Sequence, residues 1–200
     1  MRTSRKGVHR REALKTLASG AAASALWVAN LSALADRQAV QIHLAASAQA
    51  GGTWTPAVLS RAQFETVGVL VELIIPTTDT PGARAALVDR FIDGVLASGA
   101  VTDRDRFLAG IAWLDARSAA LFAAPFVAAT PAQQTDLLTR VSDDSTASGE
   151  SRIGVEFFTA LKTLTITGYY TTEIGLRQEL GDDGRVMLTT FEGCTHPEHQ

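Results

Sequence analysis

The stretch SRAQFETVGVLVELIIP, residues 60–76, carries the clearest helical pattern of this chain. It begins with a capping box, in which the Ser60 side chain accepts a hydrogen bond from a free amide of the first helical turn and Gln63 bonds back to the amide of Ser60. Pro76 ends the pattern, because its ring disfavours a helical conformation at the preceding residue. Between these ends, four apolar residues recur at spacings of three and four and therefore share one helix face: Phe64, Val67, Val71 and Ile74.

The same helical periodicity continues toward the C-terminus. Caps, prolines and apolar stripes predict helices over residues 60–75, 83–99, 102–124, 130–141, 152–168 and 172–180. A strand over residues 163–167 is an alternative, since this run is rich in β-branched side chains. Short strands that alternate with hairpin turns occur nowhere in the sequence. We therefore predict an all-α fold, a compact bundle of five or six short helices after an N-terminal signal segment.

A change of charge marks the N-terminus. Residues 1–15 contain six Lys or Arg and one acid, residues 16–35 contain no charge, and Ala33-Leu34-Ala35 presents small side chains directly before Asp36. A basic, an apolar and a small-residue region in this order are typical of a secretory signal peptide, with cleavage expected after Ala35. The alternatives are a membrane anchor that stays attached and a signal of the general secretory type. The anchor is disfavoured because the segment is rich in Ala, Ser and Gly.

The type of signal is indicated by the basic region. His9-Arg10-Arg11-Glu12-Ala13-Leu14-Lys15 resembles the twin-arginine export motif, with Arg10 and Arg11 as the paired arginines. It departs from that motif at His9 and Ala13, where Ser or Thr and Phe are usual. The expected organisation is thus a signal peptide over residues 1–35, a linker over 36–59 without periodicity, and a helical domain over 60–200.

The remaining composition excludes several classes of protein. The chain has 18 basic and 21 acidic residues, and without the six and one of residues 1–15 it holds 12 and 20. Such an acidic body argues against nucleic-acid binding. No dinucleotide fingerprint, phosphate loop, zinc helix or nucleophile elbow is present, so we expect no catalytic residues, no cofactor site and no metal site in this chain. Asp89 and Asp93, one helical turn apart, are interpreted as solvent-facing acids.

The C-terminal tail contains the single cysteine of the chain. Cys194, His196, Glu198 and His199 are of the types that bind zinc or copper, but no second group of ligands lies upstream. An unpaired cysteine in an exported protein suggests a bond to another chain. We therefore interpret Cys194 as a partner contact, through an inter-subunit disulfide, with a buried free thiol as the alternative.

Several blocks keep a fixed order across residues 60–194. They are IIPTTDTPGA at 74–83, PF at 125–126 with TPAQQ at 130–134, FFTALKTL at 157–164 with GYYTTEIG at 168–175, and FEGC at 191–194. Together with the twin-arginine start, this set resembles the gluconate 2-dehydrogenase subunit 3 family. The sequence departs from the family pattern at Asp182-Asp183-Gly184-Arg185, where a Pro-Gly-containing segment is usual.

The resemblance implies the non-catalytic small subunit of a periplasmic sugar or polyol dehydrogenase complex that is peripheral to the inner membrane. In such complexes, an FAD-dependent large subunit oxidises the substrate and a cytochrome c subunit, which carries haem c, passes the electrons on. The small subunit stabilises the large one and escorts it through the twin-arginine translocase. Candidate contacts are the loop Thr78-Asp79-Thr80, Tyr169 and Tyr170, which have alternative roles as helix cap and core residues.

Two other functions remain open from the residues alone. One is a stand-alone periplasmic binding module, and the other is an independent exported enzyme with an unrecognised carboxylate site.

Overall fold

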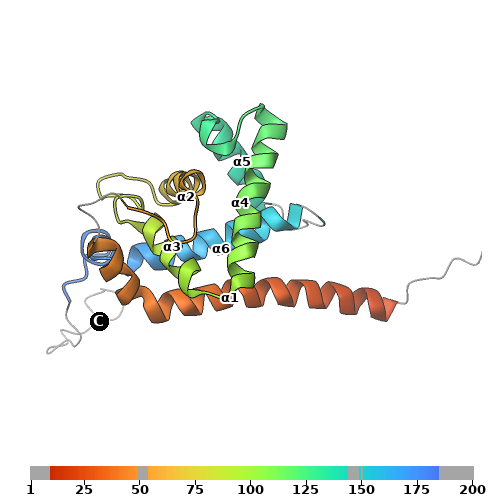
Figure 1. Ribbon diagram of the computed structural model, residues 1–200, viewed down its shortest axis with the longest axis horizontal. Coiled ribbons are helices and arrows are strands. Elements are labelled where there is room, and N and C mark those ends of the chain that lie inside the picture. The colour runs from red at the N-terminus through yellow and green to blue at the C-terminus, as the bar shows by residue number, and fades with distance from the viewer. Residues whose placement is uncertain (1–9, 49–53, 144–148, 150, 185–200) are drawn as a thin grey trace, which may run out of the picture.

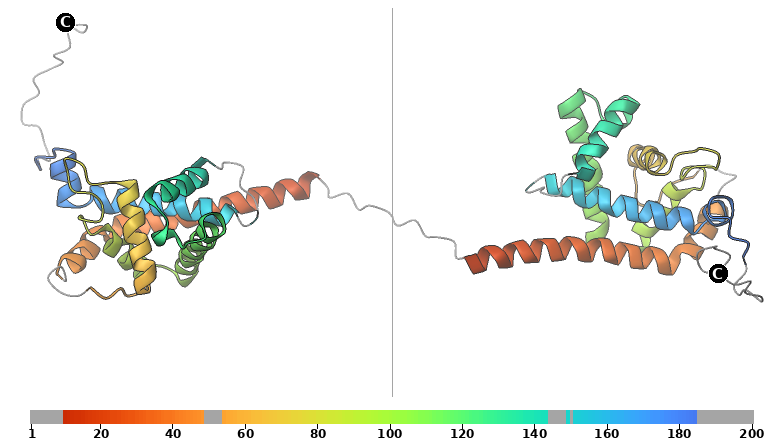
Figure 2. Two further views of the ribbon diagram at one scale, coloured as in Figure 1. Left: turned by 90° about the horizontal axis from the view of Figure 1, so that it is seen from above. Right: turned by 180° about the vertical axis from the view of Figure 1, so that it is seen from behind.

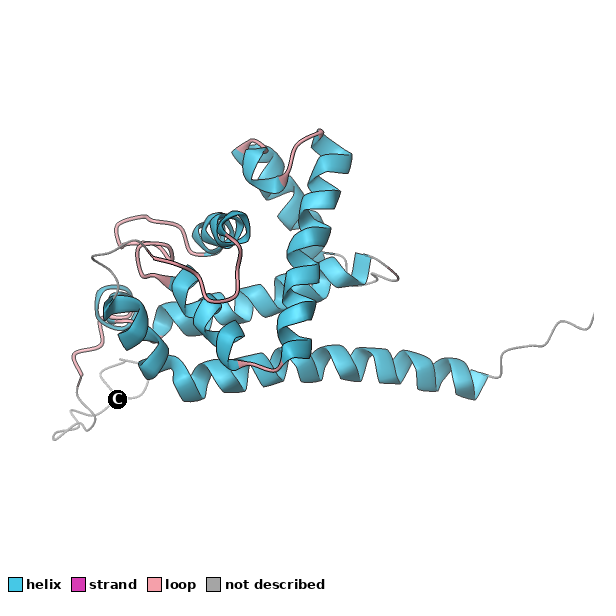
Figure 3. Cartoon of the chain, viewed as in Figure 1, coloured by secondary structure: helices cyan, strands magenta, loops and turns pink. Residues whose placement is uncertain are grey.

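The computed structural model describes residues 10–48, 54–143, 149 and 151–184 of the chain. All regular structure in these ranges is helical (Figures 1 and 3). The elements are α1 (Arg10–Ala48), α2 (Arg61–Ile74), α3 (Val88–Ser98), α4 (Val101–Phe122), the 3-10 turn η1 (Phe126–Ala128), α5 (Pro131–Asp143), α6 (Ser151–Tyr170) and the π-helical turn η2 (Ile174–Glu179). The predicted all-α fold is confirmed, and residues 163–167 belong to α6 rather than to a strand.

Local capping signals account for the starts of α2 and α5. The amide of Gln63 donates to Ser60 Oγ at 3.3 Å, and the amide of Ser60 donates to Gln63 Oε1 at 2.9 Å. Thr130 and Gln133 form the same reciprocal pair before α5, at 3.4 and 2.9 Å. Each pair satisfies two amides that the helix itself leaves without partners. The capping box predicted at Ser60 is therefore confirmed, and Thr130 begins α5 in the same way.

Helix α6 lies at the centre of the bundle, where it contacts α1 to α5 and η2. Its most buried side chains are almost inaccessible to solvent: Phe157, Leu161, Leu164 and Tyr169. Two glycines bring α4 and α6 together. A Cβ at Gly110 of α4 would overlap the Phe157 side chain, and a Cβ at Gly154 of α6 would overlap the ring of Trp113 on α4. The crossing of these two helices therefore requires glycine at both positions.

Helix α1 differs from the expectation of a signal peptide followed by a linker. It continues without a break from Arg10 to Ala48, so residues 36–48 are helical. One face of it packs against α3 and α6 (Figure 2), and the buried residues on this face recur at spacings of four and three: Trp27, Leu31, Ala35, Ala39, Ile42 and Ala46. Alanine is the best helix former, and in this helix it occurs on the exposed face as well, at Ala29 and Ala45. An apolar stripe in which three of the six residues are alanine is therefore hard to recognise in the sequence.

Two acids of α3 that we expected to face solvent are buried, so that interpretation is wrong. Asp93 is completely inaccessible, and its carboxylate accepts hydrogen bonds from three consecutive amides, Ala57, Val58 and Leu59, at 2.7, 3.1 and 2.9 Å. Asp89 is 6% exposed and accepts from the amide of Arg90 at 2.8 Å. Burial raises the pKa of Asp89. The connection before α2 thus folds over α3 and is attached to it through Asp93.

Replacing Asp93 is expected to destabilise the fold strongly. Asp93→Ala would leave three amides without an acceptor in a partly buried site, and we expect a loss of about 2–4 kcal/mol in the free energy of unfolding. The matched control is Asp105→Ala on α4, because the Asp105 side chain is 64% exposed and its ion pair with Arg104 is long, at 3.6 Å. Chemical denaturation of both variants measures the difference, and equal losses would contradict the assigned role of Asp93.

Candidate functional site

The loop that joins α2 to α3, residues 75–87, contains the TTDTPG motif and is organised by Glu72. Glu72 lies in the last turn of α2, and one carboxylate oxygen accepts from the amide and the hydroxyl of Thr77, both at 2.8 Å. The other oxygen accepts from the amide of Arg84 at 3.2 Å. Partial burial acts to raise the pKa of Glu72, but these hydrogen bonds and the charge of Arg84 outweigh it and lower the pKa. A single carboxylate thus connects both halves of the loop.

The Pro81-Gly82 pair fits this arrangement. The amide of Gly82 donates to Thr77 Oγ1 at 3.0 Å, which closes the loop on itself. A Cβ at Gly82 would lie 2.6 Å from the Thr77 nitrogen and 2.7 Å from the Glu72 carboxylate oxygens. These distances are shorter than van der Waals contact. Glycine is therefore required because the backbone passes close to the carboxylate.

Two further elements hold the loop from the other side. The hydroxyl of Tyr169, a core residue of α6, donates to the carbonyl of Pro81 at 2.8 Å. The Thr80 hydroxyl donates to the Glu179 carboxylate on η2. Tyr170 is half-buried, and its ring meets that of Tyr169 edge-on at 5.2 Å. Side chains from α2, α6 and η2 therefore fix the backbone of this loop.

The tip of the loop remains accessible. Thr78 and Asp79 are exposed, while Thr80 is half-buried. The Thr78 hydroxyl donates to Asp79 Oδ1 at 2.9 Å, and this hydrogen bond lowers the pKa of Asp79. Of the three candidate contacts in this loop, two are thus available to a partner and the third supports them.

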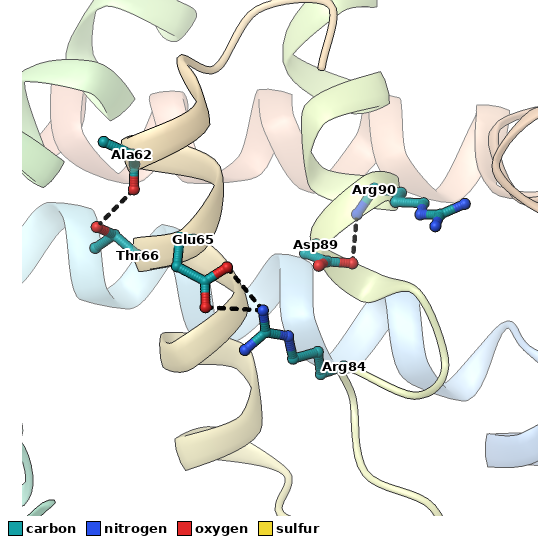
Figure 4. A network of polar contacts seen from close by, with 6 residues as sticks. All are labelled: Ala62, Glu65, Thr66, Arg84, Asp89 and Arg90. Carbon is teal, nitrogen blue, oxygen red and sulfur yellow. Dashed lines mark hydrogen bonds and ion pairs between the residues drawn. The ribbon is translucent and has the colours of Figure 1, made fainter. Parts of the chain in front are cut away.

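Arg84 connects the end of the loop to the middle of α2 (Figure 4). Its Nη2 lies 2.9 and 2.8 Å from the two carboxylate oxygens of Glu65. A Cβ at Gly68 would lie 3.3 Å from the Arg84 guanidinium, so this glycine leaves room for the arginine to lie against α2. Both side chains of the pair are about half exposed, and such pairs contribute little to stability. The pair therefore orients Arg84 more than it stabilises the fold.

A second accessible feature is an open apolar groove of about 310 Å³ between α2, α5 and α6. Leu73 and Ile74 line it from α2, Leu138 from α5 and Phe158 from α6. At its edge, the Lys162 ammonium lies 4.9 Å from the centre of the Phe158 ring. The groove contains no carboxylate or imidazole that could act as a general base. Its lining suits an apolar side chain better than a reacting substrate.

His43 is a half-buried residue of α1 that the sequence did not single out. Its ring stacks on Phe91 of α3 with a centroid distance of 4.7 Å, and Nε2 lies 2.9 Å from Thr171 Oγ1 beyond the end of α6. Burial lowers the pKa of His43, and a hydrogen bond with the backbone of Gly168 partly opposes this effect. One imidazole thus joins α1 to α3 and to the chain after α6.

The other predicted site residues are distributed differently. Arg10 and Arg11 are the first two residues of α1. Ala33 is half-buried in that helix and Ala35 is fully buried. Cys194 and the histidine-containing tail lie outside the described residues.

Within the described ranges, no three His, Cys, Asp or Glu side chains are arranged to hold a metal ion. None of the helices described is both long and apolar enough to span a bilayer.

These features define an all-helical protein whose accessible surface includes a fixed loop and an apolar groove. The family model for gluconate 2-dehydrogenase subunit 3 matches residues 61–182, which is more than half of the chain and extends from the start of α2 to just beyond η2. The chain therefore belongs to the gluconate 2-dehydrogenase subunit 3 family. Members of this family are subunits of a multi-subunit dehydrogenase, so the chain has partner subunits. No curated protein and no solved structure gives a significant match.

The role of Glu72 can be separated from that of a surface charge. Glu72→Ala removes the acceptor of three hydrogen bonds and is expected to lower the free energy of unfolding by about 2 kcal/mol. Glu65→Ala, on the same helix, removes only the exposed pair with Arg84 and is expected to cost less than about 1 kcal/mol. Denaturant titration of both variants checks this order, and the reverse order would show that the loop does not depend on Glu72.

The contacts of His43 predict a pH dependence of stability. Because the folded state lowers the pKa of His43, the unfolded chain binds the proton more tightly. The contribution of this residue is therefore complete above about pH 6.5, the ordinary value for histidine, and decreases as the pH falls below it. Melting temperatures between pH 5 and 8 should decrease more steeply on acidification for the wild type than for His43→Gln. The other three histidines are present in both proteins, so a difference between the two curves reports on His43. Parallel curves would contradict this assignment.

Proposed function

We propose that this chain is the non-catalytic small subunit of a flavoprotein dehydrogenase complex that oxidises a sugar or polyol. In this proposal the chain binds the folded FAD-dependent large subunit in the cytoplasm, stabilises it, and brings it through the twin-arginine translocase. The assembled complex then resides in the periplasm, peripheral to the inner membrane. The observation that carries the proposal is the family match over residues 61–182 in a chain that also holds the Arg10-Arg11 motif.

The residues of this chain support the assignment of the redox groups to partner subunits. Covalent attachment of haem c uses a Cys-x-x-Cys-His motif, and this chain has a single cysteine. It also lacks the glycine-rich fingerprint that holds the pyrophosphate of FAD. FAD is therefore assigned to the large subunit and haem c to a cytochrome c subunit. The small subunit contributes binding surface rather than chemistry.

The extent of α1 supports a role in export. The N-terminal part of this helix extends beyond α4 and α6 (Figures 1 and 2). Arg10 lies seventeen positions before Trp27, a buried residue of the face that packs on the bundle, which corresponds to about 26 Å of helix. The paired arginines thus stand away from the folded domain, where a receptor could reach them while a large partner is bound.

Two surfaces are proposed to contact the large subunit. The loop tip at Thr78 and Asp79 offers hydroxyl and carboxylate groups on a fixed backbone, and the groove beside Phe158 offers an apolar depression. Interfaces commonly combine an apolar centre with a polar rim. Cys194 is a third proposed contact, as one half of an inter-subunit disulfide.

The escort role is tested by the double variant Arg10→Lys with Arg11→Lys, expressed together with the large subunit in the native host. The charge is conserved but the motif is lost, so the amount of large subunit in the periplasm is expected to fall at least about tenfold. Arg2→Lys with Arg5→Lys is the matched control, because it changes two arginines outside the motif. Normal export of the large subunit by the variant Arg10→Lys with Arg11→Lys would contradict the escort role.

Co-purification separates this function from the two alternatives. A tagged chain isolated from its host should retain the FAD-dependent large subunit and the cytochrome. A monodisperse chain without companions would favour a stand-alone binding module. A lone chain that oxidises a sugar with an artificial electron acceptor would favour an independent enzyme.

A further inference from the structure

The expected cleavage motif lies inside a core helix. Ala35, the residue before the expected cut, is completely inaccessible, and two residues upstream of it, Trp27 and Leu31, are 2% and 1% exposed. All three belong to the hydrophobic core cluster of the bundle. Leu34, between the two alanines of the motif, contacts the junction of α3 and α4, where it lies 3.4 Å from the position of a Cβ on Gly99. Residues on both sides of the motif therefore contribute to packing.

Over the part of α1 whose side chains are described, removal of residues 1–35 would take away three of the six buried apolar residues. Ala39, Ile42 and Ala46 would stay with the domain, together with His43 and its contacts to Phe91 and Thr171. The surface of the bundle that Trp27, Leu31 and Ala35 now cover would become exposed to solvent. Exposure of a large apolar surface is unfavourable unless another chain covers it.

We propose that the exported chain keeps α1, because folding of the bundle encloses the Ala33-Leu34-Ala35 motif before a peptidase can reach it. Proteolysis of a folded protein proceeds through a locally opened form, so its rate depends on how often the segment opens. Opening here requires α1 to unwind across the motif and Trp27, Leu31 and Ala35 to leave the core. The same segment thus serves as the export signal and as a permanent helix of the domain. The inference relies on the proposed function only for the export route.

The mass of the exported chain tests this proposal directly. The complex is isolated from the periplasmic side of the native host through a C-terminal tag on this chain, and the intact mass of the chain is measured. We expect a mass that includes Trp27 and the residues before it. An N-terminus at Asp36 in most of the material would overturn the proposal.

A pair of leucine variants tests whether burial is the cause. Leu31→Ala weakens the closed position of α1, and the cut fraction is expected to rise at least about tenfold. Leu26→Ala is the matched control, because Leu26 lies on the same helix and is 62% exposed. Equal cutting of the two variants would contradict protection by burial.

The same sample distinguishes this inference from the proposed function. A chain that starts at Asp36 but retains its large subunit overturns only the retention of α1. A chain of full mass without a partner overturns only the escort role.

Discussion

The burial of α6 among the other helices is the constraint from which the arrangement of the bundle follows. Every other α-helix of the described structure contacts α6, and Phe157, Leu161, Leu164 and Tyr169 on its buried face are at most 1% exposed. Close packing of this kind transmits a change in one side chain to its neighbours, because interiors contain few voids. Close packing also explains the two glycines at the α4–α6 crossing, because a side chain at either position would push the two helices apart. The position of α6 in turn places Tyr169 beneath the loop before α3.

The loop itself illustrates a different kind of stabilisation. Ala83 and Ala86 anchor its last part in the core, but the conformation of the TTDTPG segment depends on hydrogen bonds that Glu72 and Glu179 accept and Tyr169 donates. These acceptors and donors lie on three separate elements, so the loop adopts this form only when the bundle has assembled around it. The sequence IIPTTDTPGA thus encodes more than the end of one helix and the start of another. Thr77, Pro81 and Gly82 each meet a specific requirement of the hydrogen-bonding pattern.

Features with local causes could be predicted from the sequence, and features with distant causes could not. The helices α2 and α5 follow from capping boxes that span four residues, and the predicted boundaries agree with the structure to within two residues. The burial of Asp93 was missed because its donors lie 34 to 36 residues earlier in the chain. The contacts of His43 were missed for the same reason, since Thr171 is 128 residues away. Residues 36–48 were predicted as a linker and not as part of a helix, because alanine occurs on both the buried and the exposed faces of this segment and gives little contrast between them.

The network around Thr77 also has an entropic consequence for association. A flexible loop loses conformational freedom when it binds, and the cost reduces the affinity of the complex. In this chain the backbone of the loop is ordered during folding, so that cost belongs to the formation of the subunit and not to its assembly. Any protein that recognises Thr78 and Asp79 would meet groups already in position. Recognition at this tip would then discriminate by shape, because a preorganised surface adapts little to a mismatched partner.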